Sequence, residues 1–134
     1  GSGYFIQIAS GDTVTITNNT VFNRGNIITF YGDQPRAFVF TNNVTGHGLY
    51  GVHGPIDVNS AAAKAMIHAN IFFNNMGVGS GDVNFPAGNE FVESVDKVGF
   101  TDRAARDFRL MPGSRYCPSN GNCPGISFPF FTNR

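Results

Sequence analysis

The chain has 134 residues, nine basic and nine acidic side chains, and a formal net charge of zero. A neutral chain has no bulk field that attracts nucleic acid or an anionic membrane surface, and no apolar run reaches the length of a membrane span. We therefore expect neither partner. The 14 Phe and 17 Gly, with no Trp, are typical of strands and turns, so we expect one all-β domain over residues 1–134.

Taken in chain order, the apolar segments are short and rich in β-branched or aromatic residues. Residues 4–8 (YFIQI) predict a first strand. Three longer units follow, at about 12–33, 36–57 and 61–92, and each combines such runs with Gly and Asn. This pattern excludes long helices. Residues 77–90 are predicted to form a long Gly-rich loop within the third unit.

A short repeat organises these units. Thr-Asn-Asn occurs at 17–19 and 41–43, and a third, degenerate copy ends at Asn70. The residues three and five positions before Asn19, Asn43 and Asn70 are apolar in every copy, and these two positions share one face of a strand. The spacings of 24 and 27 residues lie in the range that indicates a solenoid.

The repeated Asn residues predict how such a chain turns its corners. Asn tolerates the left-handed backbone conformation that a sharp bend requires. Stacked Asn side chains also donate hydrogen bonds along the column that they form. We therefore predict an all-β, parallel β-helix of about three full coils, in which Asn19, Asn43 and Asn70 form a structural ladder rather than a catalytic group.

The same stretches resemble the right-handed parallel β-helix proteins of the pectate-lyase-like superfamily. The resemblance covers residues 13–32, 38–54 and 98–116. Its most specific part is the tail, where the matching residues are Phe100, Asp102, Asp107, Phe108, Arg109, Leu110, Pro112, Gly113 and Ser114. The resemblance implies a right-handed winding, the C-terminal portion of a longer solenoid, and a secreted protein that binds a polysaccharide. It leaves open a lyase or hydrolase activity.

The two ends of the predicted solenoid differ. Residues 93–134 predict a capping segment and a tail, in which Phe128, Phe130 and Phe131 lie along the solenoid or against a partner. Nothing comparable covers residues 4–8, and an uncapped coil exposes strand edges and apolar side chains. Unless residues 4–8 fold over this end, we expect it to meet an upstream coil or a second copy. The alternative function is thus a non-catalytic module that stacks end to end.

Candidate catalytic residues are scattered along the chain. Gly46-His47-Gly48 imitates a motif of the superfamily's hydrolases, but no Arg-x-Lys follows it and no aspartate pair precedes it. Since hydrolysis needs a carboxylate pair, His47 alone does not support it. His53 lies six residues further on, about 20 Å away along a straight strand, so the two would share a metal only if the chain bends between them. Otherwise both histidines are expected to face solvent.

Lyases of the superfamily use Arg or Lys as the base and hold Ca²⁺ with carboxylates. The corresponding candidates are Asp33 with Arg36 and Asp57 with Lys64, which fall at predicted coil junctions. The same residues are equally consistent with solvated turns. Calcium requires six to eight oxygen ligands. Bound Ca²⁺ is therefore expected only if acidic residues gather, and the sequence otherwise predicts neither a metal nor a cofactor.

Aromatic residues offer a binding function without catalysis. Tyr31, Tyr50 and Phe30 lie near the predicted ends of strands. An exposed ring provides a flat apolar surface on which a sugar can stack. Tyr31 and Tyr50 are therefore the candidate ligand-binding residues, although most of the Phe side chains are expected in the core.

The chain contains two cysteines, six residues apart. Cys117 and Cys123 flank an Asn-Gly pair, which is a strong tight-turn signal, so the two thiols can meet across a small loop. By the chain-entropy relation such a bond contributes about 2–2.5 kcal/mol. The alternatives are a pair of reduced thiols in a cytosolic protein, or a zinc site that needs further ligands. A disulfide favours a secreted or extracytoplasmic location.

Overall fold

The computed structural model describes residues 4–9, 11–32, 35–48, 50–53, 66–75, 87–118 and 121–126. These residues form strands with one short 3-10 helix, and no helix among them is long and apolar enough to cross a membrane. In chain order the elements are β1 (Ile6–Ile8), β2 (Thr13–Thr17), β3 (Thr20–Val21), β4 (Ile28–Phe30), β5 (Ala37–Thr41), β6 (Val44–Gly48), β7 (Val52–His53), β8 (Ile67–His68), β9 (Ile71–Asn75), β10 (Glu90–Val92), η2 (Val95–Lys97), β11 (Phe100–Asp102) and β12 (Asp107–Leu110).

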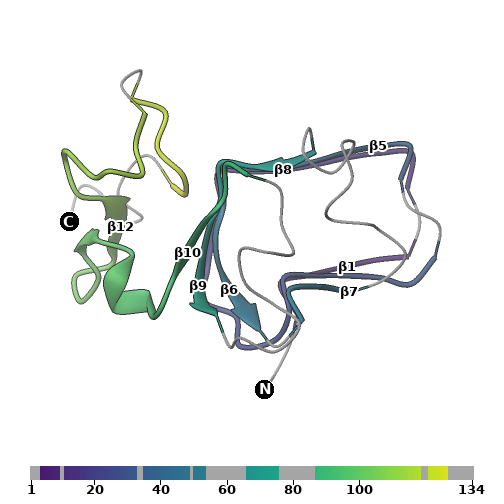
Figure 1. Ribbon diagram of the computed structural model, residues 1–134, viewed down its shortest axis with the longest axis horizontal. Helices are drawn as coiled ribbons and strands as arrows, with labels where there is room; N and C mark the ends of the chain where they lie inside the picture. Colours follow the sequence, from purple (N-terminus) through teal and green to yellow (C-terminus); the bar gives the residue numbers. More distant parts are fainter. Residues whose placement is uncertain are drawn as a thin grey trace.

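The strands from β1 to β10 form three sheets in which every pairing is parallel. Sheet A has the order β1-β4-β7, sheet B has β2-β5-β8, and sheet C has β3-β6-β9-β10. Each strand pairs with the strand one repeat later, so that Thr13 faces Ala37 and Phe40 faces Ile67. Successive strands of each sheet overlie one another in Figure 1. The all-β class and the parallel pairing predicted from the Asn repeat are confirmed.

At the corner between sheets B and C, two consecutive residues have different structural roles. Asn18, Asn42 and Ala69 have left-handed backbone conformations, with φ of 59°, 57° and 59°. The ladder residue comes directly after each of them. The sequence analysis predicted the correct triplet, but it assigned both the bend and the ladder to the same Asn. In the structure the first residue of each pair forms the bend, and the second forms the ladder.

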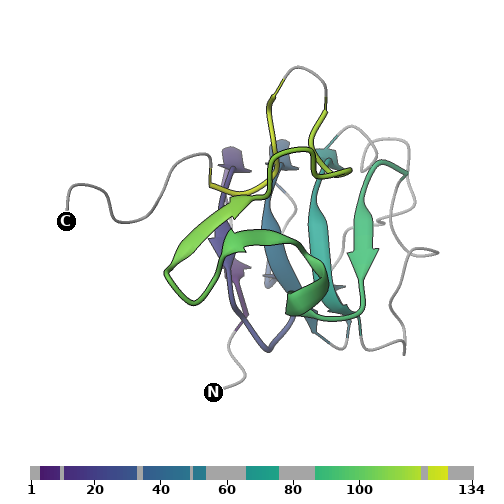
Figure 2. The ribbon, with the colours of Figure 1, turned by 90° about the vertical axis from the view of Figure 1, so that its left-hand side faces the viewer.

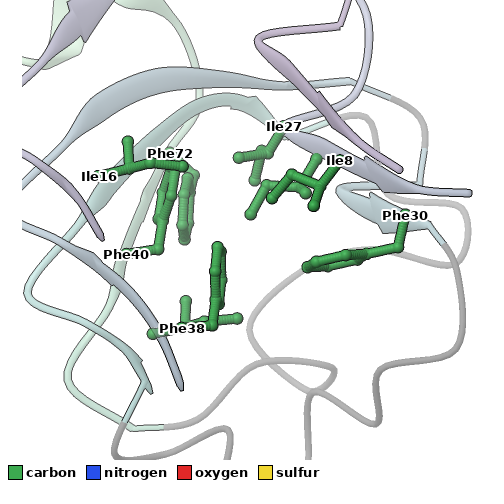
Figure 3. Close-up of a cluster of buried hydrophobic side chains, with 9 residues drawn as sticks. Ile8, Ile16, Ile27, Phe30, Phe38, Phe40 and Phe72 are labelled. Carbon is green, nitrogen blue, oxygen red and sulfur yellow. The ribbon is translucent and has the colours of Figure 1, made fainter. Parts of the chain in front are cut away.

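The interior between the sheets is filled by aromatic and branched side chains (Figure 3). The rings of Phe38 and Phe40 stack at 6.4 Å between centroids, and Phe40 stacks on Phe72 at 6.5 Å. Phe30 meets Phe38 edge to face at 5.5 Å. Since Phe30 is buried, the expectation that it lies among the exposed rings was wrong: it is the last residue of β4 and points into the core.

Residues after β10 pack against the outer face of sheet C (Figures 1 and 2). There β11 and β12 form an antiparallel pair. Val44 and Phe73 of sheet C share an apolar cluster with Val98 and Leu110. The described part of this segment therefore covers a lateral face, whereas the sequence predicted a cap at the end of the stack. The predicted Phe tail lies outside the described residues.

Candidate functional site

The Asn ladder joins successive strands of the sheet B to sheet C corner. The side-chain amide nitrogen of Asn19 donates to Asn43 Oδ1 at 2.9 Å, and that of Asn43 donates to Asn70 Oδ1 at 3.2 Å. The main-chain N–H groups of Asn19 and Asn43 donate to the same oxygens at 3.0 and 2.9 Å. Asn43 and Asn70 are fully buried. The predicted ladder is confirmed.

A fourth residue continues the ladder. The amide nitrogen of Asn70 donates to Asn89 Oδ1 at 2.9 Å, and Asn89 in turn donates to the carbonyl of Ile67 at 3.0 Å. Gly88, with φ of 99°, occupies the left-handed position before it. The sequence interpretation placed both residues in a Gly-rich loop. A left-handed-tolerant residue followed by Asn and then an apolar strand was the signal that it missed.

His47 lies inside the molecule and does not face solvent, so the sequence expectation for it was wrong. It sits on β6, fully buried, and its ring meets those of Phe72 and Phe91 edge to face. Its Nδ1 is 2.7 Å from the carbonyl oxygen of Gly48. Burial lowers the pKa of His47 below its ordinary value of 6.5, because removing the imidazolium from water is unfavourable. The Gly46-His47-Gly48 motif is therefore part of a buried strand and not of an exposed site.

The exposed candidates on sheet A do not form one platform. Tyr50 is 51% exposed and its ring lies 6.0 Å from that of His53, which is also exposed. Tyr31 is 64% exposed. Because Ile28 is level with Val52, Tyr50 is level with Asn26, five residues before Tyr31 along the neighbouring strand. Tyr31 follows β4 and Tyr50 precedes β7, so the two residues lie beyond opposite ends of this parallel pair of strands.

Arg36 has a different partner from the predicted one. Its Nε donates to Asp12 Oδ1 at 2.5 Å, because the pairing of β2 with β5 sets residues 12 and 36 side by side. Both side chains are exposed, and the hydrogen bond to Asp12 raises the pKa of Arg36. Such a pair contributes little stability, since water screens it. Asp33, Asp57 and Lys64 lie outside the described residues.

The two cysteines form the predicted disulfide, Cys117–Cys123, and the loop that follows is tied to the Asn corner. The Gly125 N–H donates to the carbonyl of Asn42 at 2.6 Å, and Asn18 Nδ2 donates to Gly125 O at 3.3 Å. Gly125 has φ of 80°, and a Cβ there would lie 2.6 Å from Thr20 Oγ1. Only glycine fits this approach, which holds the disulfide loop against sheet C.

A cleft of about 280 Å³ lies between the Asn corner and the disulfide loop. We call it the corner cleft. Ala69, Gly88 and Glu90 line one side, and Arg115 and Tyr116 line the other. Arg115 and Tyr116 also border a second, open depression of about 470 Å³ with Glu93 and Lys97. The two hollows therefore adjoin at the Arg115–Tyr116 pair, beside β10.

Arg115 is held in place by its neighbour. Its Nη2 donates to the hydroxyl oxygen of Tyr116 at 3.0 Å, and its guanidinium carbon lies 4.8 Å from the centre of that ring. This hydrogen bond, with a smaller contribution from Glu90, raises the pKa of Arg115. The result is an exposed, oriented cation next to an aromatic ring and a carboxylate. A guanidinium group held in this way can donate its other N–H groups to the oxygen atoms of a hydroxyl or carboxylate ligand.

The described residues contain no candidate metal site. No group of three or more His, Cys, Asp or Glu side chains among them is close enough to hold an ion. The expectation of Ca²⁺ thus stays untested, since Asp33 and Asp57 are not described. The corner cleft was missed by sequence reasoning because its two walls are 25 residues or more apart in sequence, and nothing near Arg115 signals that Glu90 is its neighbour.

Comparison of the chain with protein-family models, with curated proteins and with solved structures finds no match in any of the three.

Proposed function

We propose that this chain is a right-handed parallel β-helix module of the pectate-lyase-like kind that binds a polysaccharide. The fold proposal is supported by the order of the strands. Sheets B, C and A are entered in turn, and the register repeats after 24 residues between Thr13 and Ala37 and again between Ile28 and Val52. The right-handed sense follows from the strong preference of parallel strand crossovers for that hand.

The corner cleft is the observation that supports polysaccharide binding. It presents Arg115 and Glu90, which form hydrogen bonds with sugar hydroxyl groups, beside the half-buried ring of Tyr116. The adjoining depression adds Lys97. An extended chain of sugars can lie across both hollows with the Arg115–Tyr116 pair between them. The two hollows also carry Glu90 and Glu93, so we propose that Arg115 and Lys97 bind the carboxylates of an acidic glycan while the two glutamates accept hydrogen bonds from its hydroxyl groups.

Binding, rather than cleavage, is what the described residues support. His47 is buried against Phe72, and Arg36 is paired with Asp12 away from the corner cleft. A lyase or hydrolase needs a base or a carboxylate pair next to the scissile bond. Glu90 lines the corner cleft and Glu93 lines the adjoining depression, so the two carboxylates lie in different hollows and do not face each other across one of them. We therefore assign no reaction to the module.

We further propose that the module works outside the cytoplasm. The Cys117–Cys123 disulfide supports this location, since such bonds persist in oxidising compartments. Secretion also fits a polysaccharide ligand, which is commonly met at or beyond the cell surface.

A glycan array read alongside ultraviolet absorbance for unsaturated uronate products tests the proposal. The wild-type protein is expected to bind acidic glycans without forming product. Arg115→Gln is expected to weaken binding about tenfold, the loss of one charge-assisted hydrogen bond. Arg103→Gln is the matched control, because Arg103 is an exposed arginine paired with Asp96 outside the cleft. Absence of binding to every acidic glycan, or equal losses in the two variants, would contradict the proposal.

The first strands favour a second candidate function, a non-catalytic assembly module. In the part of the chain that the structure describes, β1, β2 and β3 each pair with one strand only. An edge of this kind accepts a further strand. The two functions depend on different surfaces, so each can fail without the other.

A further inference from the structure

Aromatic rings from distant parts of the chain meet on the outer side of sheet C. The ring of Phe22, the residue after β3, lies 5.1 Å from that of Phe108 and 5.8 Å from that of Phe100. It also lies 6.0 Å from the ring of Phe73 on β9. Phe22 is nevertheless 47% exposed. Three neighbouring rings therefore hold this ring in place while part of it faces solvent.

Phe22 lines a hollow of about 380 Å³ that it shares with the β11–β12 hairpin. Figure 2 shows this hairpin lying across the strands of sheet C. The other described residues that line the hollow are Arg103, Ala104, Arg106 and Phe108. We call it the hairpin hollow. Its described lining has two guanidinium groups and two phenyl rings but no acidic side chain, whereas the corner cleft contains Glu90.

The acidic side chains around the hairpin are engaged in other contacts. Asp96 pairs with Arg103 at 2.9 Å, and Asp107 pairs with Arg109. Asp102 Oδ1 accepts a main-chain N–H within the turn at 3.1 Å. A guanidinium group carries several N–H donors, so an arginine can bind a further acceptor and keep the contacts that it already makes. The side chains that line the hairpin hollow therefore offer donors and no acceptor.

Arg106 occupies a backbone conformation that favours glycine. Its φ is 64°, and its N–H donates to the carbonyl of Arg103 at 3.0 Å, which closes the turn. Glycine or asparagine forms such a turn at lower cost. Residues in unfavourable backbone conformations are concentrated at sites of function. Binding of a ligand by the guanidinium group accounts for an arginine at this position.

We propose that the hairpin hollow binds a planar aromatic carboxylate. The ring of the ligand stacks on the exposed part of Phe22, and its carboxylate accepts hydrogen bonds from Arg106 and Arg103. A sugar is less suited to this hollow, because its hydroxyl donors would meet no side-chain acceptor in the described lining. The site is separate from the corner cleft, so the proposal does not depend on polysaccharide binding.

Fluorescence titration with naphthoate, a fluorescent aromatic carboxylate, tests the proposal. The wild type is expected to bind naphthoate saturably, and to bind naphthylmethanol, which has the ring without the carboxylate, at least about tenfold more weakly. Glucuronate has the carboxylate without the aromatic ring. It should not displace naphthoate, even if it binds in the corner cleft.

Three variants locate the site. Arg106→Gly should weaken naphthoate binding about tenfold without lowering the unfolding temperature, since glycine accepts a φ of 64°. Arg109→Gln is the matched control, because Arg109 lies on β12, pairs with Asp107 and does not line the hollow. Arg115→Gln changes the corner cleft instead. Both of these variants should bind naphthoate like the wild type.

Four results would overturn the proposal. The wild type could bind no naphthoate, or could bind naphthylmethanol equally well. Arg106→Gly could bind naphthoate as tightly as Arg109→Gln does. Finally, a loss of naphthoate binding in Arg115→Gln as large as that in Arg106→Gly would assign the aromatic carboxylate to the corner cleft.

Discussion

Sheets B and C have the same parallel pairing, yet their outer faces meet different surroundings. In β5 of sheet B the outward residues Ala37 and Val39 are exposed, whereas Phe38 and Phe40 point into the core. In β6 of sheet C all residues from Val44 to Gly48 are buried. Sheet B is thus solvated on one face, and sheet C is covered on both. An alternating pattern predicts a half-exposed strand only where no distant segment covers the outer face.

The cover of sheet C is also what creates the candidate site. Residues after β10 pack on Val44, Ile71 and Phe73. The disulfide loop then ends beside the Asn corner, where Arg115 and Tyr116 face Glu90 across the cleft. Sheet B has no such second layer among the described residues, and its exposed candidate, Arg36, makes only a surface ion pair. The candidate binding site is therefore at sheet C, where the C-terminal segment packs on the outer face.

The largest effect is expected at the corner that the two sheets share. Asn43→Leu removes the acceptor of two Asn19 donors and the donor to the carbonyl of Ile16. Buried partners without hydrogen bonds are costly, so the free energy of unfolding should fall by about 3–5 kcal/mol in urea denaturation. Asn42→Gly should change it by less than about 1 kcal/mol, because glycine accepts the left-handed conformation. Equal losses of unfolding free energy in the two variants would show that positions 42 and 43 do not have separate roles.

A smaller effect should distinguish the two outer faces directly. Phe73→Ala removes a buried ring between sheet C and the C-terminal segment, and should lower the free energy of unfolding by about 3 kcal/mol. Val39→Ala, on the outer face of sheet B and 37% exposed, should cost less than about 1 kcal/mol. Thermal or urea denaturation of both variants measures the difference. If Phe73→Ala is as mild as Val39→Ala, the outer face of sheet C is not covered as described.

The smallest effect concerns the inner face of sheet C and depends on pH. The folded pKa of His47 is below its ordinary 6.5, so the unfolded chain binds the proton more readily. Stability should therefore fall as the pH drops below 6.5 and level off below the folded pKa, with a slope of at most about 1.4 kcal/mol per pH unit. Urea denaturation between pH about 7.5 and about 5 measures it.

The matched variants for this slope are His47→Phe and His53→Ala. His47→Phe removes the buried imidazole and should abolish the decline, whereas His53→Ala alters an exposed position on β7 and should keep it. A decline that persists in His47→Phe would assign the pH dependence to another group.

The ladder and the pairing of strands could be predicted from the sequence because both are set by residues that recur at regular spacing. Asn19, Asn43 and Asn70 fix which residues are level, and the apolar positions three before them then face the core. The residue type that makes the bend was less predictable. Ala69 adopts a left-handed conformation that its side chain does not favour, because the ladder on either side imposes it.

The rest could not be predicted because it depends on contacts between distant parts of the chain. His47 was expected to face solvent, and it is buried by Phe91, which lies more than forty residues later. Gly125 reaches Asn42 and Asn18 across the outer face of sheet C. No local sequence pattern predicts such contacts. The corner cleft depends on them, so the sequence alone pointed to Tyr31 and Tyr50 instead.

The central claim is that the rungs stack in parallel with their Asn corners in register. Side-chain amide NOEs in ¹⁵N-asparagine-labelled protein test it most directly, since amides on adjacent rungs are about 4.8 Å apart. We expect cross-peaks that link Asn19 to Asn43, Asn43 to Asn70, and Asn70 to Asn89. Absence of these links in the folded protein, or a direct link between Asn19 and Asn70, would contradict the stacked arrangement.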